Sequence, residues 1–109
     1  MTTAIKNKTL KQVKEMAAFI KERFKAKDVI LFGSYAYGKP NRNSDVDLMV
    51  ILRALRGKSY KKATEIRLAL DTRFDVNFPM DMLVRTDEQF REKKDDYFFR
   101  EVREKGKYL

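Results

Sequence analysis

Apolar residues recur with two different periods along this chain, and the alternation restricts the folds that it can adopt. Residues 29–32, 45–52 and 75–84 are short runs with the length and composition of β-strands. Around them, apolar residues recur at steps of three and four, as on one face of a helix. The predicted order is helix, strand, short helix, strand, helix, strand, helix. This order predicts an α/β (α+β) fold, in which a small mixed β-sheet is flanked by helices.

Local signals predict where the helices begin and end. Thr9 followed by Gln12 has the spacing of a capping box, so the first helix is expected to begin near Thr9. Thr86 and Gln89 repeat that spacing and predict the start of the last helix, which continues through residues 97–102 and ends at Gly106. The stripe predicted to be buried in the first helix is Leu10, Val13, Ala17, Ile20 and Phe24.

Length and composition exclude several classes of protein. A chain of 109 residues with 43% apolar residues is expected to form one domain, residues 1–109, with one hydrophobic core. The absence of cysteine excludes disulfide scaffolds and zinc fingers, and the absence of histidine excludes a Ser-His-Asp triad. The longest uninterrupted apolar stretch, residues 48–52, is far shorter than the ~20 residues of a membrane span. We therefore expect a cytoplasmic protein without membrane contact, whose chemistry depends on carboxylates, hydroxyls and Lys or Arg.

The net charge indicates the kind of partner. Lys and Arg number 25 against 16 Asp and Glu, which gives a formal charge of +9 and favours an anionic partner such as nucleotide phosphates, nucleic acid or an acidic protein surface. Because the basic residues are scattered along the whole chain, their excess taken alone is better explained by solubility. No strand face interleaves basic and aromatic residues, so nucleic-acid binding is the weakest of these interpretations.

Two acidic residues stand at the start of the second predicted strand. Asp45 and Asp47 are two positions apart, so their carboxylates project from the same face of the strand. Two such charges repel each other unless a cation lies between them, and Mg²⁺ is the hard cation that prefers oxygen ligands of this kind. Taken alone, the pair is better explained as a solvated strand face.

Asp81 and the Gly33-Ser34 pair make a metal site a stronger interpretation of these acids. Asp81 interrupts the apolar run 78–84, and it either occupies an exposed edge, pairs with a lysine or binds a metal. If its strand lies beside that of Asp45 and Asp47, three carboxylates meet on one sheet face, which is the ligand set of a two-metal site for displacement at phosphorus. Gly33 and Ser34 directly follow the first strand, where a glycine lets the backbone approach a phosphate closely, although most such pairs are ordinary turns.

Together these residues resemble a known family. Gly33-Ser34, ten intervening residues and Asp45-Val46-Asp47 are similar to the Gly-Ser, ten residues, Asp-x-Asp signature of the DNA polymerase beta-like nucleotidyltransferase superfamily. The resemblance extends over roughly residues 10 to 109, because the helices and strands and the third aspartate follow in the order of that family. The short length is similar to that of the minimal nucleotidyltransferases, the antitoxin-like partners of HEPN proteins.

The resemblance implies a role for each of these residues. Asp45 and Asp47 would bind two Mg²⁺ ions, and Asp81 would be the third carboxylate, closest to the attacking hydroxyl. Tyr37 stands where many relatives have arginine, and Lys39 or Arg42 would supply the charge that this position lacks. The nucleotide-binding residues implied in this way are Gly33, Ser34, Lys39, Arg42 and Ser44.

The resemblance also implies a reaction. An acceptor hydroxyl would attack the α-phosphate of a nucleoside triphosphate, most simply ATP, and release pyrophosphate. In such pairs the acceptor is a tyrosine of the HEPN toxin, which is silenced by adenylylation, as in type VII-like toxin–antitoxin systems. Two alternatives remain open from the residues: a non-catalytic module that masks a partner protein, and a basic nucleic-acid-binding domain.

Overall fold

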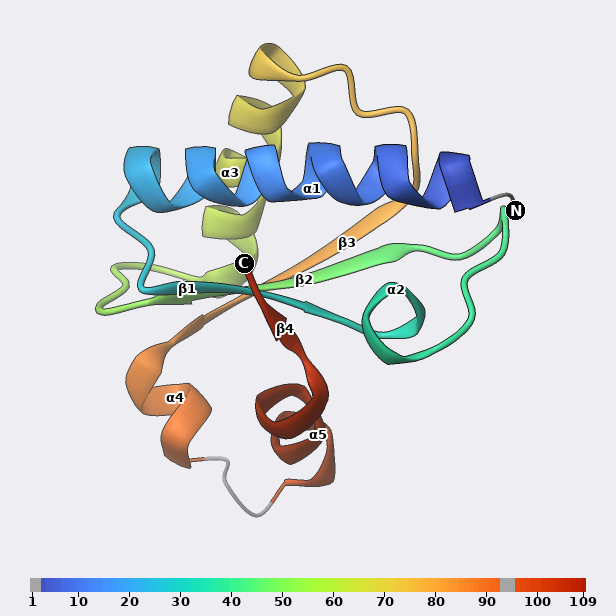
Figure 1. Cartoon of the computed structure of the whole chain (residues 1–109). Helices are drawn as coiled ribbons and strands as arrows, with labels where there is room; N and C mark the ends of the chain where they lie inside the picture. The colour runs from blue at the N-terminus through green and yellow to red at the C-terminus, as the bar shows by residue number, and fades with distance from the viewer. Residues whose placement is uncertain (1–2, 93–95) are drawn as a thin grey trace.

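Helices and strands alternate along the chain in the predicted order as far as the third long strand (Figure 1). The computed structural model describes residues 3–92 and 96–109. The elements of the first half are α1 (Thr3–Phe24), β1 (Asp28–Phe32), α2 (Ser34–Tyr37) and β2 (Val46–Leu52). Those of the second half are α3 (Ser59–Arg73), β3 (Met80–Thr86), α4 (Asp87–Glu92), α5 (Tyr97–Lys105) and β4 (Lys107–Tyr108).

The strands form one mixed sheet in the order β3-β2-β1-β4. β1 is antiparallel to both β2 and β4, whereas β2 and β3 are parallel and are connected by α3. β2 is central, and every residue in it except Asp47 is buried. This near-continuous burial explains why residues 48–52 are all apolar, since a central strand with both faces covered has no polar side. The predicted mixed sheet flanked by helices is confirmed.

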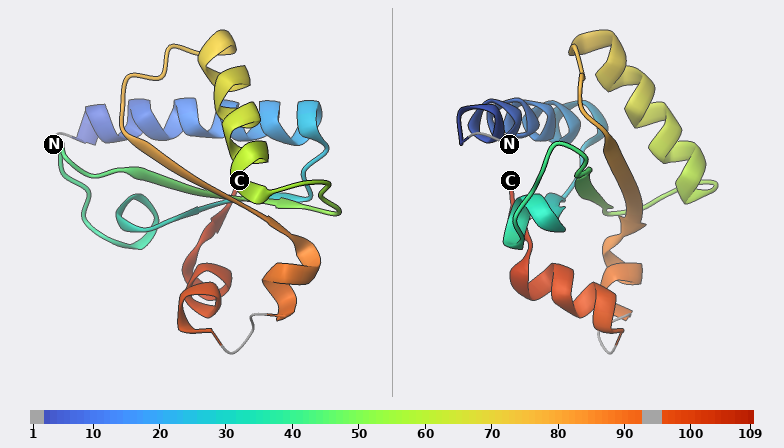
Figure 2. Two further views of the ribbon diagram at one scale, coloured as in Figure 1. Left: turned by 180° about the vertical axis from the view of Figure 1, so that it is seen from behind. Right: turned by 90° about the vertical axis from the view of Figure 1, so that its right-hand side faces the viewer.

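Helices cover both faces of the sheet (Figures 1 and 2). On one face, the side chains of α1 and α3 pack against alternate residues of β1 and β2, including Leu31, Leu48 and Val50. On the other face, α4 and α5 cover the intervening residues, among them Met49 and Ile51. The sheet is therefore the middle of three layers, and its second face is apolar only where α4 and α5 lie over it.

The first helix begins earlier than the capping-box spacing predicts. α1 starts at Thr3, and Gln12 donates a hydrogen bond from Nε2 to the backbone oxygen of Asp75 at 3.0 Å. The prediction of a start near Thr9 is wrong because nothing upstream interrupts the helix: residues 3–8 contain neither glycine nor proline. Gln12 is used instead to attach the loop that follows α3. The predicted stripe is confirmed at Val13, Ala17 and Ile20, which are fully buried.

The third strand is shorter and later than the run 75–84 suggests. β3 begins at Met80, immediately after Pro79, because proline has no N–H to donate to a strand pairing. The Pro79 carbonyl still accepts a hydrogen bond from the Val46 amide at 2.9 Å, which holds the two strands in register. The capping box is confirmed here: Thr86 and Gln89 exchange backbone-to-side-chain hydrogen bonds of 2.9 and 3.1 Å.

The C-terminal region is more divided than the sequence pattern indicates. It contains two helices, α4 and α5, and the junction at residues 93–95 of the predicted continuous helix lies outside the described residues. Asp96 begins α5 by accepting hydrogen bonds from the amides of Phe98 and Phe99. The helix ends at Gly106, as predicted, and the chain then adds the unpredicted strand β4 to the edge of β1. Within the described ranges, no helix has the length and apolar character of a membrane span.

Candidate active site

The pairing of β2 with β3 brings together the acidic residues singled out in the sequence. The two strands are parallel, and the Cα atom of Asp47 is the direct partner of that of Asp81. Paired residues on adjacent strands lie about 4.8 Å apart and project from the same face. That face is the one which α4 and α5 cover further along the strands, where Met49 and Ile51 are fully buried. At Asp47 the side chain is half-buried, and at Asp81 it is exposed, so this end of the face is open to solvent.

The surroundings of Asp47 alter the ionisation of its carboxyl group. The pKa of Asp47 is raised above its usual value, first by burial and then by the negative charges of Asp81 and Asp45. Asp45 precedes β2 by one residue and is half-buried. The charges of Asp81 and Asp45 therefore act on Asp47 through space, and a cation between these side chains would offset both the repulsion and the desolvation of Asp47.

Gly33 brings the first strand into the same site. Phe32, the last residue of β1, is the antiparallel partner of Asp47, and Gly33 follows it with a φ of 73°. A Cβ atom at position 33 would overlap Oδ2 of Asp47. The backbone turn that leads into Ser34 and α2 is thus in direct contact with the central carboxylate. Glycine is required here twice, for its backbone conformation and for the space that its missing side chain leaves.

The donor set fits Mg²⁺ in its chemistry. All three side chains offer carboxylate oxygens, the ligands that this ion takes, and two carboxylates together with substrate phosphates and water commonly complete its coordination. In the described part of the chain, no three acidic side chains stand close enough to enclose an ion as they are placed. Asp81 is exposed on the edge strand β3, so its side chain can change rotamer without displacing packed neighbours.

The raised pKa of Asp47 gives a testable pH dependence in the absence of metal. A carboxylate whose pKa is higher in the folded state destabilises the fold once it ionises, so its stabilising effect is present at low pH and is lost as the pH rises through the folded pKa. Asp47→Asn should therefore increase the free energy of unfolding at pH 7 by about 0.5 kcal/mol after allowance for solvent screening. The gain should disappear near pH 3, where the wild-type carboxyl is protonated as well.

Thermal unfolding in EDTA at the two pH values measures this effect, which corresponds to about 2–4 °C at neutral pH. Millimolar Mg²⁺ should then stabilise the wild type but not Asp47→Asn, because a ligand stabilises only the state that binds it. A variant that is less stable than the wild type at pH 7 without metal would contradict the repulsion described above.

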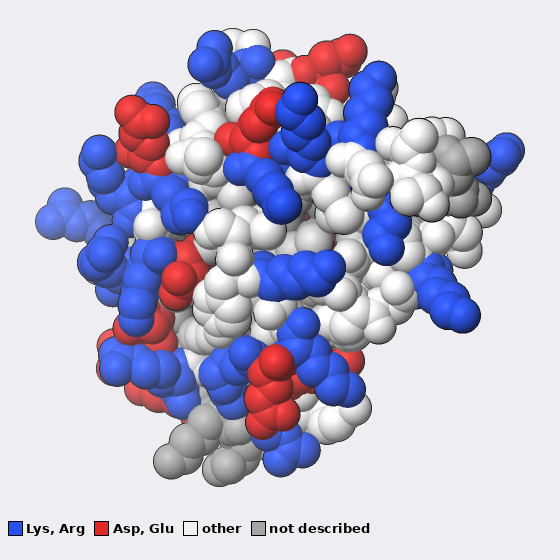
Figure 3. Space-filling view, viewed as in Figure 1, with Lys and Arg blue, Asp and Glu red and all other residues white. Residues whose placement is uncertain are grey.

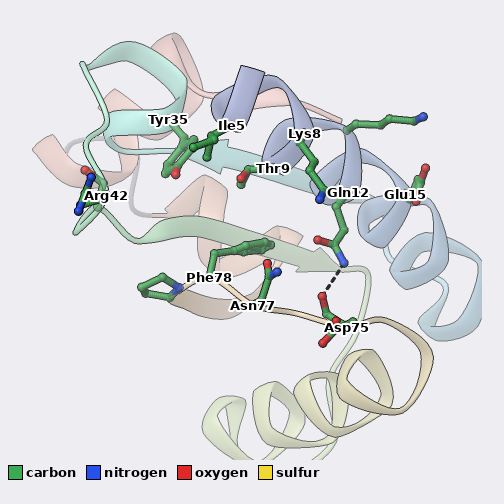
Figure 4. A pocket seen from close by; sticks show the side chains of 13 residues that line it. Ile5, Lys8, Thr9, Gln12, Glu15, Tyr35, Arg42, Asp75, Asn77 and Phe78 are labelled. Carbon is green, nitrogen blue, oxygen red and sulfur yellow. Dashed lines mark hydrogen bonds between the residues drawn. The ribbon is translucent and has the colours of Figure 1, made fainter. Parts of the chain in front are cut away.

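A cavity lies away from the acids. A space of about 700 Å³ opens between the start of α1, the loop before β2 and the segment before β3 (Figure 4). Tyr35 and Phe78 line it, together with polar side chains from α1 and from the loops. Arg42 and Ser44 also line this cavity, but the three acids, Gly33 and Ser34 do not. Two of the predicted nucleotide-binding residues therefore border this cavity, and one of them, Ser44, is also the chain neighbour of Asp45.

The loop between α2 and β2 explains the position of these residues. The Ser44 hydroxyl accepts a hydrogen bond from the Asn41 amide at 2.9 Å, and the Ser44 amide donates to the Asn41 carbonyl at 3.0 Å. Ser44 thus closes a local turn. Lys39 and Tyr37 are exposed, Tyr37 with 39% of its surface accessible. The structure brings Gly33, Asp47 and their neighbours together, while the cations expected to replace the usual arginine lie in this solvent-facing loop.

Comparison with known proteins identifies the family of this chain. Residues 13–109 match the family described as "Nucleotidyltransferase domain". This chain belongs to that family. The match includes β1, β2 and β3 with Gly33 and the three acids, so the residues that form the site lie inside the matched region.

Similar proteins from one organism agree with this nucleotidyltransferase assignment. One protein of Methanocaldococcus jannaschii, named "Putative protein adenylyltransferase", is 43% identical over 47 residues, which are 39% of this chain and 47% of the relative. A second protein of that organism with the same description is 29% identical over 84 residues, 66% of this chain and 86% of the relative. The chain thus spans about half the length of the first of these relatives.

A solved structure shows the fold alone. The crystal structure described as a "putative nucleotidyltransferase" from Sulfolobus solfataricus superposes with a TM-score of 0.61 at 22% identity, covering 99% of this chain and 86% of that one. Its likeness supports the arrangement of helices around the mixed sheet.

The site also has an aromatic neighbour that was not assigned to it from the sequence. The ring of Phe32, next to Asp47, contacts the ring of Phe98 on α5 in an edge-to-face arrangement, with centroids 5.5 Å apart. The available signal was the run of three aromatic residues at 97–99. A helix face cannot bury three consecutive side chains, so at least one of them had to remain exposed on the nucleotidyltransferase domain.

On one face of the molecule, the basic residues are distributed among acidic ones. On the face shown in Figure 3, Lys and Arg side chains are spread over much of the surface, and Asp and Glu lie among them. This face therefore carries no single basic stripe of the kind that follows a nucleic-acid backbone.

Proposed function

We propose that this domain is a Mg²⁺-dependent nucleotidyltransferase that transfers AMP from ATP to a hydroxyl group. The observation that carries the proposal is the direct strand pairing of Asp47 with Asp81 beside the glycine turn at Gly33. Burial and two neighbouring negative charges raise the pKa of Asp47, so this cluster of like charges is unfavourable for the fold alone. Such a cluster is expected where a protein must bind a divalent cation and phosphate.

In this proposal the three acids hold the metal and orient the reacting groups. Asp45 and Asp47 are the ligands for two Mg²⁺ ions, and Asp81 is the third ligand, on the side of the acceptor. When bound, the ions neutralise charge on the triphosphate and lower the pKa of the acceptor hydroxyl. The Gly33–Ser34 turn, which contacts Asp47 directly, binds the phosphate groups and holds the α-phosphorus beside the acids.

The position of Asp81 indicates how the acceptor approaches. β3 is an edge strand, and Asp81 is exposed on it, so an acceptor can reach this carboxylate from solvent without moving the core. The hydroxyl oxygen forms a bond to the α-phosphorus as the bond to the β-phosphate oxygen breaks. Pyrophosphate leaves with the bonding electrons, and the hydroxyl proton passes to Asp81 or to water.

We further propose that the acceptor is a tyrosine of a HEPN-type toxin, which this domain silences as the antitoxin of a type VII-like pair. The support is that the relatives in Methanocaldococcus jannaschii are named as protein adenylyltransferases. The open edge beside Asp81 also suits a macromolecular acceptor, which cannot enter an enclosed pocket. In this setting Lys39 and Arg42, in the loop before β2, contact the outer phosphates after the loop has adjusted.

The experiment is transfer of radioactive label from ATP to a HEPN protein from the same genome. With Mg²⁺, label from [α-³²P]ATP should become covalently attached to the HEPN protein, and label from [γ-³²P]ATP should not. A Tyr→Phe change at the modified position of the HEPN protein should remove the label, and EDTA should do the same. Absence of α-label transfer, or transfer of γ-label instead, would contradict the proposal.

Masking of the partner is the alternative that this assay must separate. An Asp45→Asn/Asp47→Asn double variant should bind the HEPN protein but fail to neutralise it. If the double variant neutralises the toxin as well as the wild type, contact alone is sufficient and transfer is not the function.

A further inference from the structure

Phe98 presents a partly exposed aromatic ring on the same face as the three acids. We propose that this ring is the surface on which the base of the nucleotide stacks, and that it favours purine nucleotides. The inference rests on the proposed function, because it assigns a residue to the base of the nucleotide whose phosphates bind at Gly33 and the acids. It adds a specificity-determining residue from α5, an element outside the Gly-Ser and Asp-x-Asp signature.

The position of Phe98 follows from a short series of contacts. Asp47 and Phe32 are direct partners on β2 and β1, so their side chains lie side by side on one face of the sheet. The Phe32 ring then meets the Phe98 ring edge to face, at 5.5 Å between centroids and 81° between planes. One aromatic side chain therefore separates Phe98 from the central carboxylate. A nucleotide whose α-phosphate lies at Asp47 can span that interval with its ribose and reach Phe98 with its base.

The Phe98 ring is held in place although it is exposed. Its accessible fraction is 40%, against 8% for Phe99, which is a core residue. Edge-to-face contacts with both Phe32 and Phe99 fix it, the second at 5.4 Å between centroids. The Asp96 cap, which accepts from the Phe98 amide at 2.9 Å, fixes the backbone of the first turn of α5. A ring ordered in this way loses little further entropy when a base stacks on it.

Its neighbour Tyr97 provides the contrast. Tyr97 is 67% exposed, and the Arg100 guanidinium lies over its ring, 5.9 Å from the centroid. The ring contacts that join Phe98 to Phe32 and to Phe99 do not include Tyr97. The two residues are adjacent in sequence and similar in size, but only Phe98 is linked to the carboxylates through packed side chains. Tyr97 is therefore a matched control.

Stacking on a single ring explains how so small a domain can select a base. A purine covers more of an aromatic ring than a pyrimidine does, so the apolar area removed from water is larger. Stacking between a base and an aromatic residue requires no hydrogen bonds and occurs on an open surface. Selection between purine and pyrimidine triphosphates is therefore expected, whereas selection between two purines is not a consequence of this contact.

The experiment measures binding of ATP, CTP and inorganic tripolyphosphate to the full chain by calorimetry in the presence of Mg²⁺. Phe98→Leu preserves an apolar contact with Phe32 but removes the aromatic ring. We expect its Kd for ATP to rise about tenfold to a hundredfold, whereas its Kd for tripolyphosphate should stay within about twofold of the wild type. The ratio between the Kd values of CTP and ATP should fall towards one. Tyr97→Leu should leave all three Kd values unchanged.

The outcomes separate this inference from the function on which it rests. If Phe98→Leu binds ATP as tightly as the wild type does, the inference is wrong and the proposed function stands. If Phe98→Leu loses affinity for ATP and for tripolyphosphate equally, Phe98 supports the phosphate site and does not bind the base, which also overturns the inference. If the wild type binds no ATP, both proposals are wrong. Circular dichroism on each variant ensures that the compared proteins are folded, and Phe98→Tyr, which restores a ring, should recover ATP affinity.

Discussion

Replacing Asp47 by asparagine is expected to reduce nucleotidyl transfer about a thousandfold or more. Asp47 lies between the other two acids: it pairs with Asp81 across the parallel strands and feels the charge of Asp45. An amide of the same shape removes one charged ligand from both proposed ions. Metal ions supply several kcal/mol of transition-state stabilisation in such reactions, and each 1.36 kcal/mol corresponds to a factor of ten in rate. The measurement is the rate of α-label transfer under saturating ATP and Mg²⁺.

The control for this prediction is a chemically identical change at a distant surface position. Asp71 on α3 is exposed and forms an i,i+4 ion pair with Arg67 at 3.1 Å. Exposed pairs of this kind contribute little, so Asp71→Asn should transfer label at close to the wild-type rate. Because Asp47→Asn is expected to be at least as stable as the wild type at neutral pH without metal, a loss of transfer cannot be attributed to unfolding. Equal rates of label transfer for Asp47→Asn and the wild type would show that the acids take no part in the reaction.

The part of the site that could be predicted from sequence is the part fixed by local geometry. The period of two in an extended chain predicts that Asp45, which immediately precedes β2, and Asp47 project from one face regardless of what the rest of the chain does. Local geometry does not determine which residues of a neighbouring strand pair with it. That Asp81 pairs with Asp47, and not with a residue two positions away, depends on how α3 and the Pro79 turn return the chain to the sheet. From the sequence, this pairing could be given only as a condition for the site, and the observed register of β3 against β2 meets that condition.

The expectations that failed depended on interactions between distant segments. Thr9 and Gln12 have the spacing of a capping box, but Gln12 bonds to Asp75, 63 residues away in the chain. β4 is only two residues long, and its pairing with β1 exists because α5 returns the chain to that edge. The aromatic ring of Phe98 likewise meets Phe32 only through the packing of α5 on the sheet. Periodicity reports which side chains are buried, but not against which element they pack.

Substituting Gly33 by alanine should disrupt the site more severely than the same substitution at Gly57, which also has a positive φ. The backbone there has a φ of 73°, and the new Cβ would overlap Oδ2 of Asp47. Strain of this kind costs about 1–3 kcal/mol, and the clash forces either the strand end or the Asp47 side chain to move. Because a displacement of about 1 Å in a reacting geometry can cost a hundredfold in rate, we expect transfer to fall by about that factor or more.

Gly57 provides the control, because it separates backbone strain from the clash. Its φ is 82°, close to that of Gly33, but a Cβ at position 57 would have no atom within 4 Å. Gly57→Ala should therefore lose stability through strain alone, about 1 kcal/mol in urea unfolding, and should keep the wild-type transfer rate. The difference between the two variants measures the contact between Gly33 and Asp47. If Gly33→Ala and Gly57→Ala lose equal stability and both transfer label normally, the glycine turn is not in contact with the reacting carboxylate, and its place in the site must be abandoned.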